Sequence, residues 1–330
     1  MVVLIMKRLS VLLLSLVLVA ACAPQAGYQG VPAAGGDPVS ARGQVPLAVQ
    51  FMYSFTNDAT ADYFPFEGLA GLDWGEDGTL VVCDAGRGRV HALDARVRTW
   101  TTFDNPGVQG FRPLAAQVDG FKVLVLDGTS RAIYRFDLNG AYQDRIVDLV
   151  TLDPAFESSP RDFDLDMDGR VVLSDRGEQQ ILVLDSFLGL QNRVGHPGPH
   201  DEQFNQPAGV CFLPNGGFMV ADAGNERLQR FNRLGYGESV IGGRFDPHNP
   251  FMSPQGVACD RHGNVYVADV LAGVVHVVDA RDEVVLTIGR DEPLESSLLQ
   301  PVGVALGPDQ QLAVADRERQ AILVYRLLYE

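Results

Sequence analysis

The chain has 330 residues, of which 42 are aspartate or glutamate and 26 are lysine or arginine, so its formal net charge is −16 at pH 7. An acidic surface repels nucleic-acid phosphates and anionic lipid headgroups. The composition therefore argues against nucleic acid as a partner and favours a cationic one.

The first 21 residues have the pattern of a secretory signal peptide. Lys7 and Arg8 precede an apolar run that is too short to cross a bilayer, and small residues follow it. The sequence VAAC, which ends at Cys22, resembles the lipobox of bacterial lipoproteins, whose cysteine becomes the lipidated first residue after cleavage. We expect residues 1–21 to be a lipoprotein signal peptide and the mature protein to reside in the bacterial cell envelope. An ordinary signal peptide cut nearby is the alternative, and the apolar residues ahead of Lys7 favour Met6 as the start.

Residues 22–46 follow as a lipidated cysteine and a flexible tether. The stretch APQAGYQGVPAAGGDPVSARGQVP is rich in alanine, glycine and proline and has little to bury. Acyl chains on Cys22 would attach the protein to the membrane without spanning it. A soluble domain is then expected over residues 47–330.

That domain carries an internal repeat. Six short β-branched runs end in aspartate, with successive steps of 43, 48, 47, 47 and 47 residues between the closing aspartates. These are Asp84, Asp127, Asp175, Asp222, Asp269 and Asp316. A fixed period in this range is typical of a repeat architecture.

Each repeat divides into four short strands separated by Gly, Asn and Pro turns. In the fourth copy we expect strands at Ala208–Phe212, Gly217–Asp222, Arg227–Asn232 and Gly237–Ile241. The period is 2 rather than 3.6, so helices should be nearly absent. Six four-stranded units predict an all-β, six-bladed β-propeller.

The fourth copy resembles an NHL repeat. The similarity runs from Gly195 to Gly235 and includes QFNQP, Gly-Val in the first strand, Ala-Asp at the end of the second, and Asn225 and Arg227 before the third. The resemblance covers about residues 65–327 and is strongest after Gly195. It implies a propeller and a binding platform rather than a reaction.

The ring is expected to close through the N-terminal segment. The last repeat, ending in AILVYRLLYE, supplies a third strand but no fourth, while Pro46–Phe55 alternates as a strand does. Both edges would expose unpaired backbone groups. We therefore predict that Pro46–Phe55 pairs with the outside of Ala321–Leu328.

The remaining cysteines predict no disulfide framework. Cys83, Cys211 and Cys259 are odd in number and widely spaced, and each lies in an apolar strand-like run. We interpret all three as small core residues.

No metal site is expected. The resemblance implies that family members acting as lyases on amidated peptides hold zinc with histidines on inner strands, and no such ligand occupies the equivalent positions here. Those positions are Ala70, Leu114, Arg161, Ala208, Gln255 and Val302. The segment DLDMDG before Asp175 has the spacing of a calcium loop, but in register it is a hairpin turn. We interpret the six closing aspartates, with Asn225 and Arg227, as acceptors and donors for neighbouring loops.

The expected function is binding. Residues that vary between copies should gather on one face around the channel, as a candidate binding face made of Arg87, Arg161, Asp162, Arg176, Glu178, Gln255 and Arg317. We interpret the protein as a monomeric scaffold, without cofactor or catalytic residues, for an envelope protein or small ligand. The alternatives are a propeller-type hydrolase or lyase at the channel mouth, and an accessory or sensor subunit of an envelope redox or secretion complex.

Overall fold

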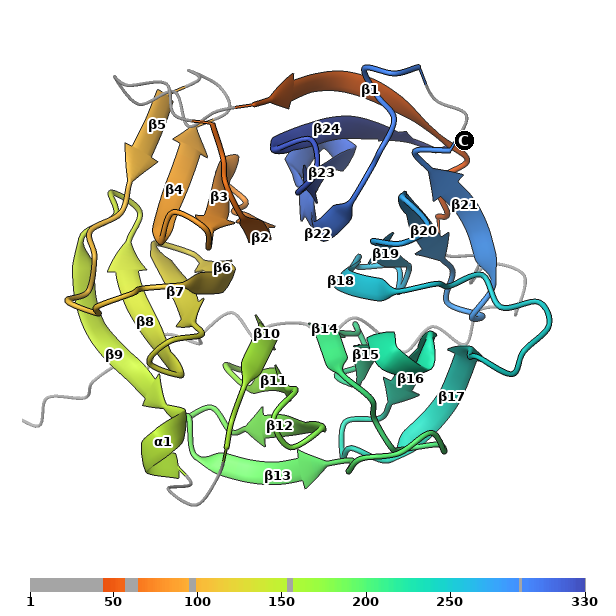
Figure 1. The fold of residues 1–330 in the computed structure, drawn as a ribbon, viewed down its shortest axis with the longest axis horizontal. Coiled ribbons are helices and arrows are strands. Elements are labelled where there is room, and N and C mark those ends of the chain that lie inside the picture. The colour runs from red at the N-terminus through yellow and green to blue at the C-terminus, as the bar shows by residue number, and fades with distance from the viewer. Residues whose placement is uncertain (1–43, 57–64, 95–98, 153–156, 291–292, 330) are drawn as a thin grey trace, which may run out of the picture. The chain divides into compact units, whose positions relative to one another are not determined.

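Six four-stranded antiparallel sheets are arranged in a ring (Figure 1). The computed structural model describes residues 44–56, 65–94, 99–152, 157–290 and 293–329. The expected signal peptide, Cys22 and most of the tether lie outside these residues. Each sheet is one blade, and the prediction of an all-β six-bladed propeller is confirmed.

The strands of each blade follow one another from the channel to the outer edge of the ring. Blade 1 has β2 (Leu69–Trp74), β3 (Thr79–Asp84), β4 (Arg89–Asp94) and β5 (Thr99–Thr102). Blade 2 has β6 (Pro113–Asp119), β7 (Lys122–Asp127), β8 (Ala132–Asp137) and β9 (Tyr142–Asp148). Blade 3 has β10 (Pro160–Leu165), β11 (Val171–Asp175), β12 (Gln180–Leu184) and β13 (Leu190–Val194).

The second half repeats the pattern. Blade 4 has β14 (Pro207–Phe212), β15 (Phe218–Asp222), β16 (Arg227–Phe231) and β17 (Gly237–Gly242), each within one residue of the predicted bounds. Blade 5 has β18 (Pro254–Cys259), β19 (Val265–Asp269), β20 (Val274–Val278) and β21 (Val284–Ile288). Blade 6 has β22 (Pro301–Gly307), β23 (Gln311–Asp316) and β24 (Ala321–Leu328). The described helices are short: α1 (Leu149–Leu152), η1 (Ala223–Asn225) and η2 (Pro308–Gln310).

Strand β1 (Ala48–Phe55) completes blade 6 from the other end of the chain. The sheet order is β1-β24-β23-β22, and the antiparallel register pairs Ala48 with Leu328 and Phe55 with Ile322. This is the closure expected from the sequence. Hydrogen bonding begins earlier, because the Asn264 side-chain amide donates to the Gln44 carbonyl at 2.9 Å.

Apolar clusters between successive blades stabilise the ring. One joins blades 6 and 1 through side chains such as Leu72 and Val324, and another joins blades 1 and 2 through Val81 and Phe136. Four more clusters continue around the ring. The second and third strands are almost wholly buried, because blades cover both of their faces.

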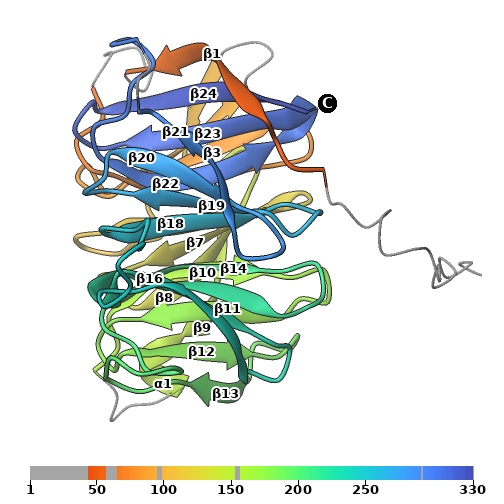
Figure 2. The same ribbon diagram turned by 90° about the vertical axis from the view of Figure 1, so that its right-hand side faces the viewer.

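The ring has two faces, between which the strands run (Figure 2). We call loop face the side that carries the closing aspartates, the second-to-third-strand loops and the connections between blades. We call turn face the side that carries the hairpin turns, Gln44 and the start of β1. In the part of the chain that the structure describes, no helix is long and apolar enough to cross a membrane.

Candidate functional site

The central channel is lined by the first strand of every blade. It encloses a cavity of about 160 Å³. Glycine is the third residue of the first strand in four blades because neighbouring backbones approach closely there. A Cβ on Gly209 would lie 2.2 Å from the Gln255 carbonyl oxygen. Blade 3 departs from this pattern, since Asp162 occupies the corresponding position.

Three carboxylates face the cavity, from Asp73, Asp162 and Asp164. They connect inner strands that do not pair with one another. Asp162 accepts from the backbone N–H groups of Phe163 (3.0 Å) and Val210 (3.3 Å). Asp164 accepts from the N–H of Phe212 in the next blade at 2.7 Å, and Asp73 in the same way from Val118 at 2.7 Å.

These carboxylates hold protons more tightly than ordinary ones. Burial raises the pKa of Asp162 and of Asp164 to about 7 and that of Asp73 to about 6, although backbone hydrogen bonds and, for Asp162, the charge of Arg161 oppose the rise. Near neutral pH the channel therefore carries less negative charge than its three acids suggest.

Four guanidinium groups lie at the loop-face end of the channel, and we call them the arginine mouth: Arg112, Arg161, Arg176 and Arg317. Burial, together with the charges of Arg176, Arg317 and Arg112, lowers the pKa of Arg161 to about 10, against the opposing charge of Asp162. Burial also lowers the pKa of Arg176, and the charge of Arg317 contributes a smaller part. The pKa of Arg317 is lowered in the same way, by burial first and then by the charge of Arg112. The four cations thus act on one another across the mouth.

The arginines are held by neutral acceptors. Arg176 donates through Nε to the Pro207 carbonyl at 3.2 Å and through Nη2 to Gln255 Oε1 at 2.9 Å. Arg317 donates through Nε to the Leu69 carbonyl at 3.4 Å. Asp162 attracts Arg161 electrostatically. Among the described residues, however, none of the four guanidinium groups forms an ion pair.

The structure brings together five of the seven residues of the candidate binding face. Arg161, Asp162 and Gln255 line the cavity, and Arg176 and Arg317 stand over it. Arg87 and Glu178 lie further out. Arg87 pairs with Glu67 at 3.0 Å, and Glu178 accepts from the Glu157 backbone N–H at 3.4 Å.

Sequence reasoning missed Arg112, Asp73 and Asp164. Arg112 is exposed and stands just before the proline that opens the first strand of blade 2. An alignment of the six first strands would have revealed all three, since Asp73 and Asp164 share one position in the repeat and Arg112 precedes the shared proline.

The closing aspartates are all fully buried, each as the last residue of its second strand, at the loop face. Each accepts from the backbone before its own first strand. Asp84 accepts from Gly68 at 2.9 Å, and Asp269 accepts from Ser253 at 2.9 Å. Asp222 also accepts from the Asn225 amide and from Arg227 Nε, both at 2.8 Å. The bond from the backbone before the first strand recurs at the remaining copies, which are Asp127, Asp175 and Asp316.

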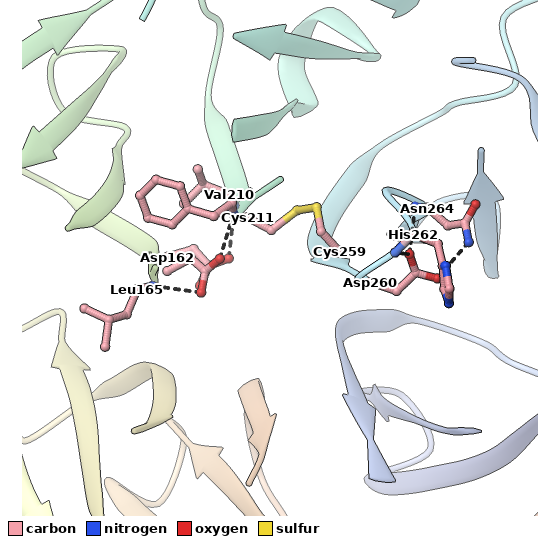
Figure 3. Close-up of a disulfide and its surroundings, with 10 residues drawn as sticks. Asp162, Leu165, Val210, Cys211, Cys259, Asp260, His262 and Asn264 are labelled. Carbon is pink, nitrogen blue, oxygen red and sulfur yellow. Dashed lines mark hydrogen bonds between the residues drawn. A yellow bond between two sulfur atoms is a disulfide. The ribbon is translucent and has the colours of Figure 1, made fainter. Parts of the chain in front are cut away.

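The expectation that all three cysteines are unpaired core residues is wrong for two of them. Cys211 and Cys259 form a disulfide between the first strands of blades 4 and 5, beside the cavity (Figure 3). Their separation of 48 residues is one repeat plus one, so the ring places them on adjacent inner strands with a Cα–Cα distance of 6.0 Å. Cys83 is a buried free thiol, as expected.

The residues that the structure describes do not fit a metal ion. Within the described residues no group of three or more His, Cys, Asp or Glu side chains is placed to hold one. In the calcium-loop-like segment, Asp166 accepts from Arg170 Nε at 2.7 Å and Asp168 pairs with Arg233 at 2.9 Å. These acids therefore serve the hairpin turn.

Comparison with known proteins identifies the family. The sequence model of the SMP-30/Gluconolactonase/LRE-like region matches residues 70–293, and that of the NHL repeat matches residues 298–325. The chain belongs to the SMP-30/Gluconolactonase/LRE-like family. It is an NHL-repeat six-bladed propeller of that family.

Relatives within this fold differ in what they do. The chain is 30% identical over 138 residues to the human E3 ubiquitin-protein ligase NHLRC1, a match that covers 42% of this chain and 33% of that protein. A streptogramin B lyase structure superposes with a TM-score of 0.61 at 13% identity, covering 83% of this chain and 97% of that chain. The calcium-binding protein regucalcin of Agrobacterium tumefaciens gives 0.61 at 15% identity, covering 84% and 95%. At these identities the two structures support the fold alone.

Proposed function

We propose that this propeller is a binding protein of the cell envelope, tethered through Cys22, that takes up an anionic ligand at the arginine mouth. The observation that carries the proposal is the convergence of four guanidinium groups at the channel mouth, none of which forms an ion pair among the described residues and of which Asp162 attracts only Arg161. Like charges do not gather at a channel mouth for the benefit of folding, because their mutual repulsion destabilises the native state. A bound anion would relieve that repulsion.

The chemistry of the mouth favours carboxylate or phosphate groups. A guanidinium presents a planar fork of N–H donors that matches two oxygens of either group. The positive charge is also confined to the mouth. The chain as a whole is strongly acidic, so an anion would meet repulsion elsewhere and attraction only here. This differs from the cationic partner that the net charge favours, because the local charge of the site has the opposite sign.

Two observations support placement in the envelope. The chain has a disulfide between Cys211 and Cys259, and disulfides are typical of proteins that leave the reducing cytoplasm. In addition, the lipobox-like sequence VAAC that ends at Cys22 supports attachment to a membrane.

The test is calorimetric titration of the full chain with succinate and with inorganic phosphate. Arg176→Gln combined with Arg317→Gln should weaken binding about 100-fold, since each charged hydrogen bond contributes roughly 1.5 kcal/mol or more and 1.4 kcal/mol is tenfold. The matched control is Arg233→Gln with Arg281→Gln, two exposed arginines on the turn face, and it should bind as the wild type does. Equal affinity in both double variants would remove the mouth from consideration.

One observation favours a second candidate, a hydrolase or lyase. Asp162 and Asp164 have pKa values of about 7, near the optimum for general acid–base catalysis. Their oxygens are, however, already engaged by backbone N–H groups. Turnover of a lactone such as gluconolactone by the wild type, lost in Asp162→Asn with binding of succinate retained, would favour the enzyme.

A further inference from the structure

The arginine mouth is bordered on one side by exposed apolar side chains. We call them the apolar rim: Met252, Leu271, Leu294 and Leu299, which are 55%, 68%, 88% and 50% exposed. They come from the connections and loops of blades 5 and 6 on the loop face. At the position that corresponds to Met252 and Leu299, blades 1, 3 and 4 carry the polar residues Glu67, Ser158 and Asn205, and blade 2 carries the buried Phe111.

The rim is continuous with the mouth. In blade 5 the backbone N–H of Val270 donates to the Ser253 carbonyl at 3.1 Å, which joins the residue before Leu271 to the residue after Met252. Gln255, two residues after Ser253, accepts from Arg176.

Blade 6 repeats this connection. The backbone N–H of Arg317 donates to the Gln300 carbonyl at 3.0 Å, directly after Leu299. A Cβ on Gly273 would lie 3.3 Å from the Leu299 carbonyl oxygen, so the blade 5 loop touches the blade 6 connection. One hydrogen-bonded frame therefore holds cations and apolar side chains next to each other.

We propose that the ligand is an acidic–apolar peptide segment of a partner protein, with a carboxylate in the arginine mouth and neighbouring apolar side chains on the apolar rim. The inference rests on the proposed function and specifies the ligand of the same site. Its argument is charge complementarity to the mouth combined with the apolar surface at its edge, since exposed apolar patches with polar surroundings mark interaction sites.

The shape of the site favours a peptide over a lipid. The cavity under the mouth has only about 160 Å³ and contains three carboxyl groups, so it offers no apolar sleeve for an acyl chain. The rim is an open surface of separate side chains. An extended peptide covers such a surface with alternate side chains while its acidic groups reach the arginines.

The probe is an octapeptide of alternating leucine and glutamate, titrated calorimetrically into the full chain beside a serine–glutamate and a leucine–glutamine octapeptide. We expect the leucine–glutamate peptide to bind about tenfold more tightly than the other two. Leu271→Ser with Leu299→Ser should abolish the advantage over serine–glutamate. The control, Leu234→Ser with Leu47→Ser on the turn face, replaces two similarly exposed leucines and should leave the advantage intact.

The outcomes separate this inference from the proposed function. If both glutamate peptides bind equally and both lose affinity in Arg176→Gln with Arg317→Gln, the anion site stands and the apolar rim is overturned. If leucine–glutamine binds as well as leucine–glutamate, or if oleate binds while no peptide does, the acidic–apolar peptide is overturned. If neither the glutamate peptides nor succinate nor inorganic phosphate binds, both proposals fail.

Discussion

Removal of the Cys211–Cys259 disulfide should lower the free energy of unfolding by about 4 kcal/mol. The bond closes a loop with a sequence separation of 48 residues. Cross-linking a loop of that length removes roughly 14 cal/mol/K of entropy from the unfolded chain, which is about 4 kcal/mol at 25 °C. The variant is Cys211→Ala with Cys259→Ala, made in the Cys22→Ser background so that the unlipidated thiol does not interfere.

The assay is urea unfolding followed by tryptophan fluorescence, with and without a reductant. The control is Cys83→Ala, which removes a buried sulfur but no cross-link and should cost only about 1 kcal/mol. In the Cys22→Ser protein that keeps Cys211 and Cys259, thiol labelling in urea without reductant should find one reactive cysteine. That cysteine is Cys83, because the other two are bonded to each other. Three labelled cysteines, or identical unfolding with and without reductant, would refute the reasoning.

Three further predictions concern closure, charge and anchoring. Deletion of residues 1–54 should lower the melting temperature by roughly 10 °C or more, because β1 packs several large side chains on blade 6, whereas deletion of residues 1–43 should cost little; equal melts would contradict the clasp. Burial raises the pKa of Asp162 and Asp164 to about 7, so the folded state holds protons that the unfolded chain releases. The free energy of unfolding should therefore fall as the pH rises from about 4 to about 8. The melting temperature of Asp162→Asn with Asp164→Asn should depend less on pH than that of the wild type, and an unchanged pH dependence would contradict this prediction. Cys22→Ser should move the protein from the membrane to the soluble fraction, and detergent-dependent retention of the variant would argue against lipidation.

The fold was predictable because its information is repeated six times. A step of 47 residues between closing aspartates and a missing last strand sufficed to predict the blades and the clasp. Individual blades did not need to be strong, since blades 1 to 3 match the repeat loosely and still form the same sheets.

The site was harder to predict because contacts around a ring depend on position within the repeat. Cys211 and Cys259 appear distant in the sequence, yet one repeat plus one residue places them on adjacent inner strands. Arg112 was missed because a charge at one position of one blade has meaning only when blades 2, 3 and 6 direct their arginine side chains to the same mouth. Such convergence follows from geometry, which a search for local motifs does not consider.

The same geometry separates the residues that maintain the ring from those that depart from the repeat. Glycine in the first strands of four blades permits close approach of the inner backbones, and an aspartate in blade 3 breaks that pattern beside Arg161. The break is affordable because Asp162 satisfies the N–H of Val210 in the next blade, so the inner strands remain connected.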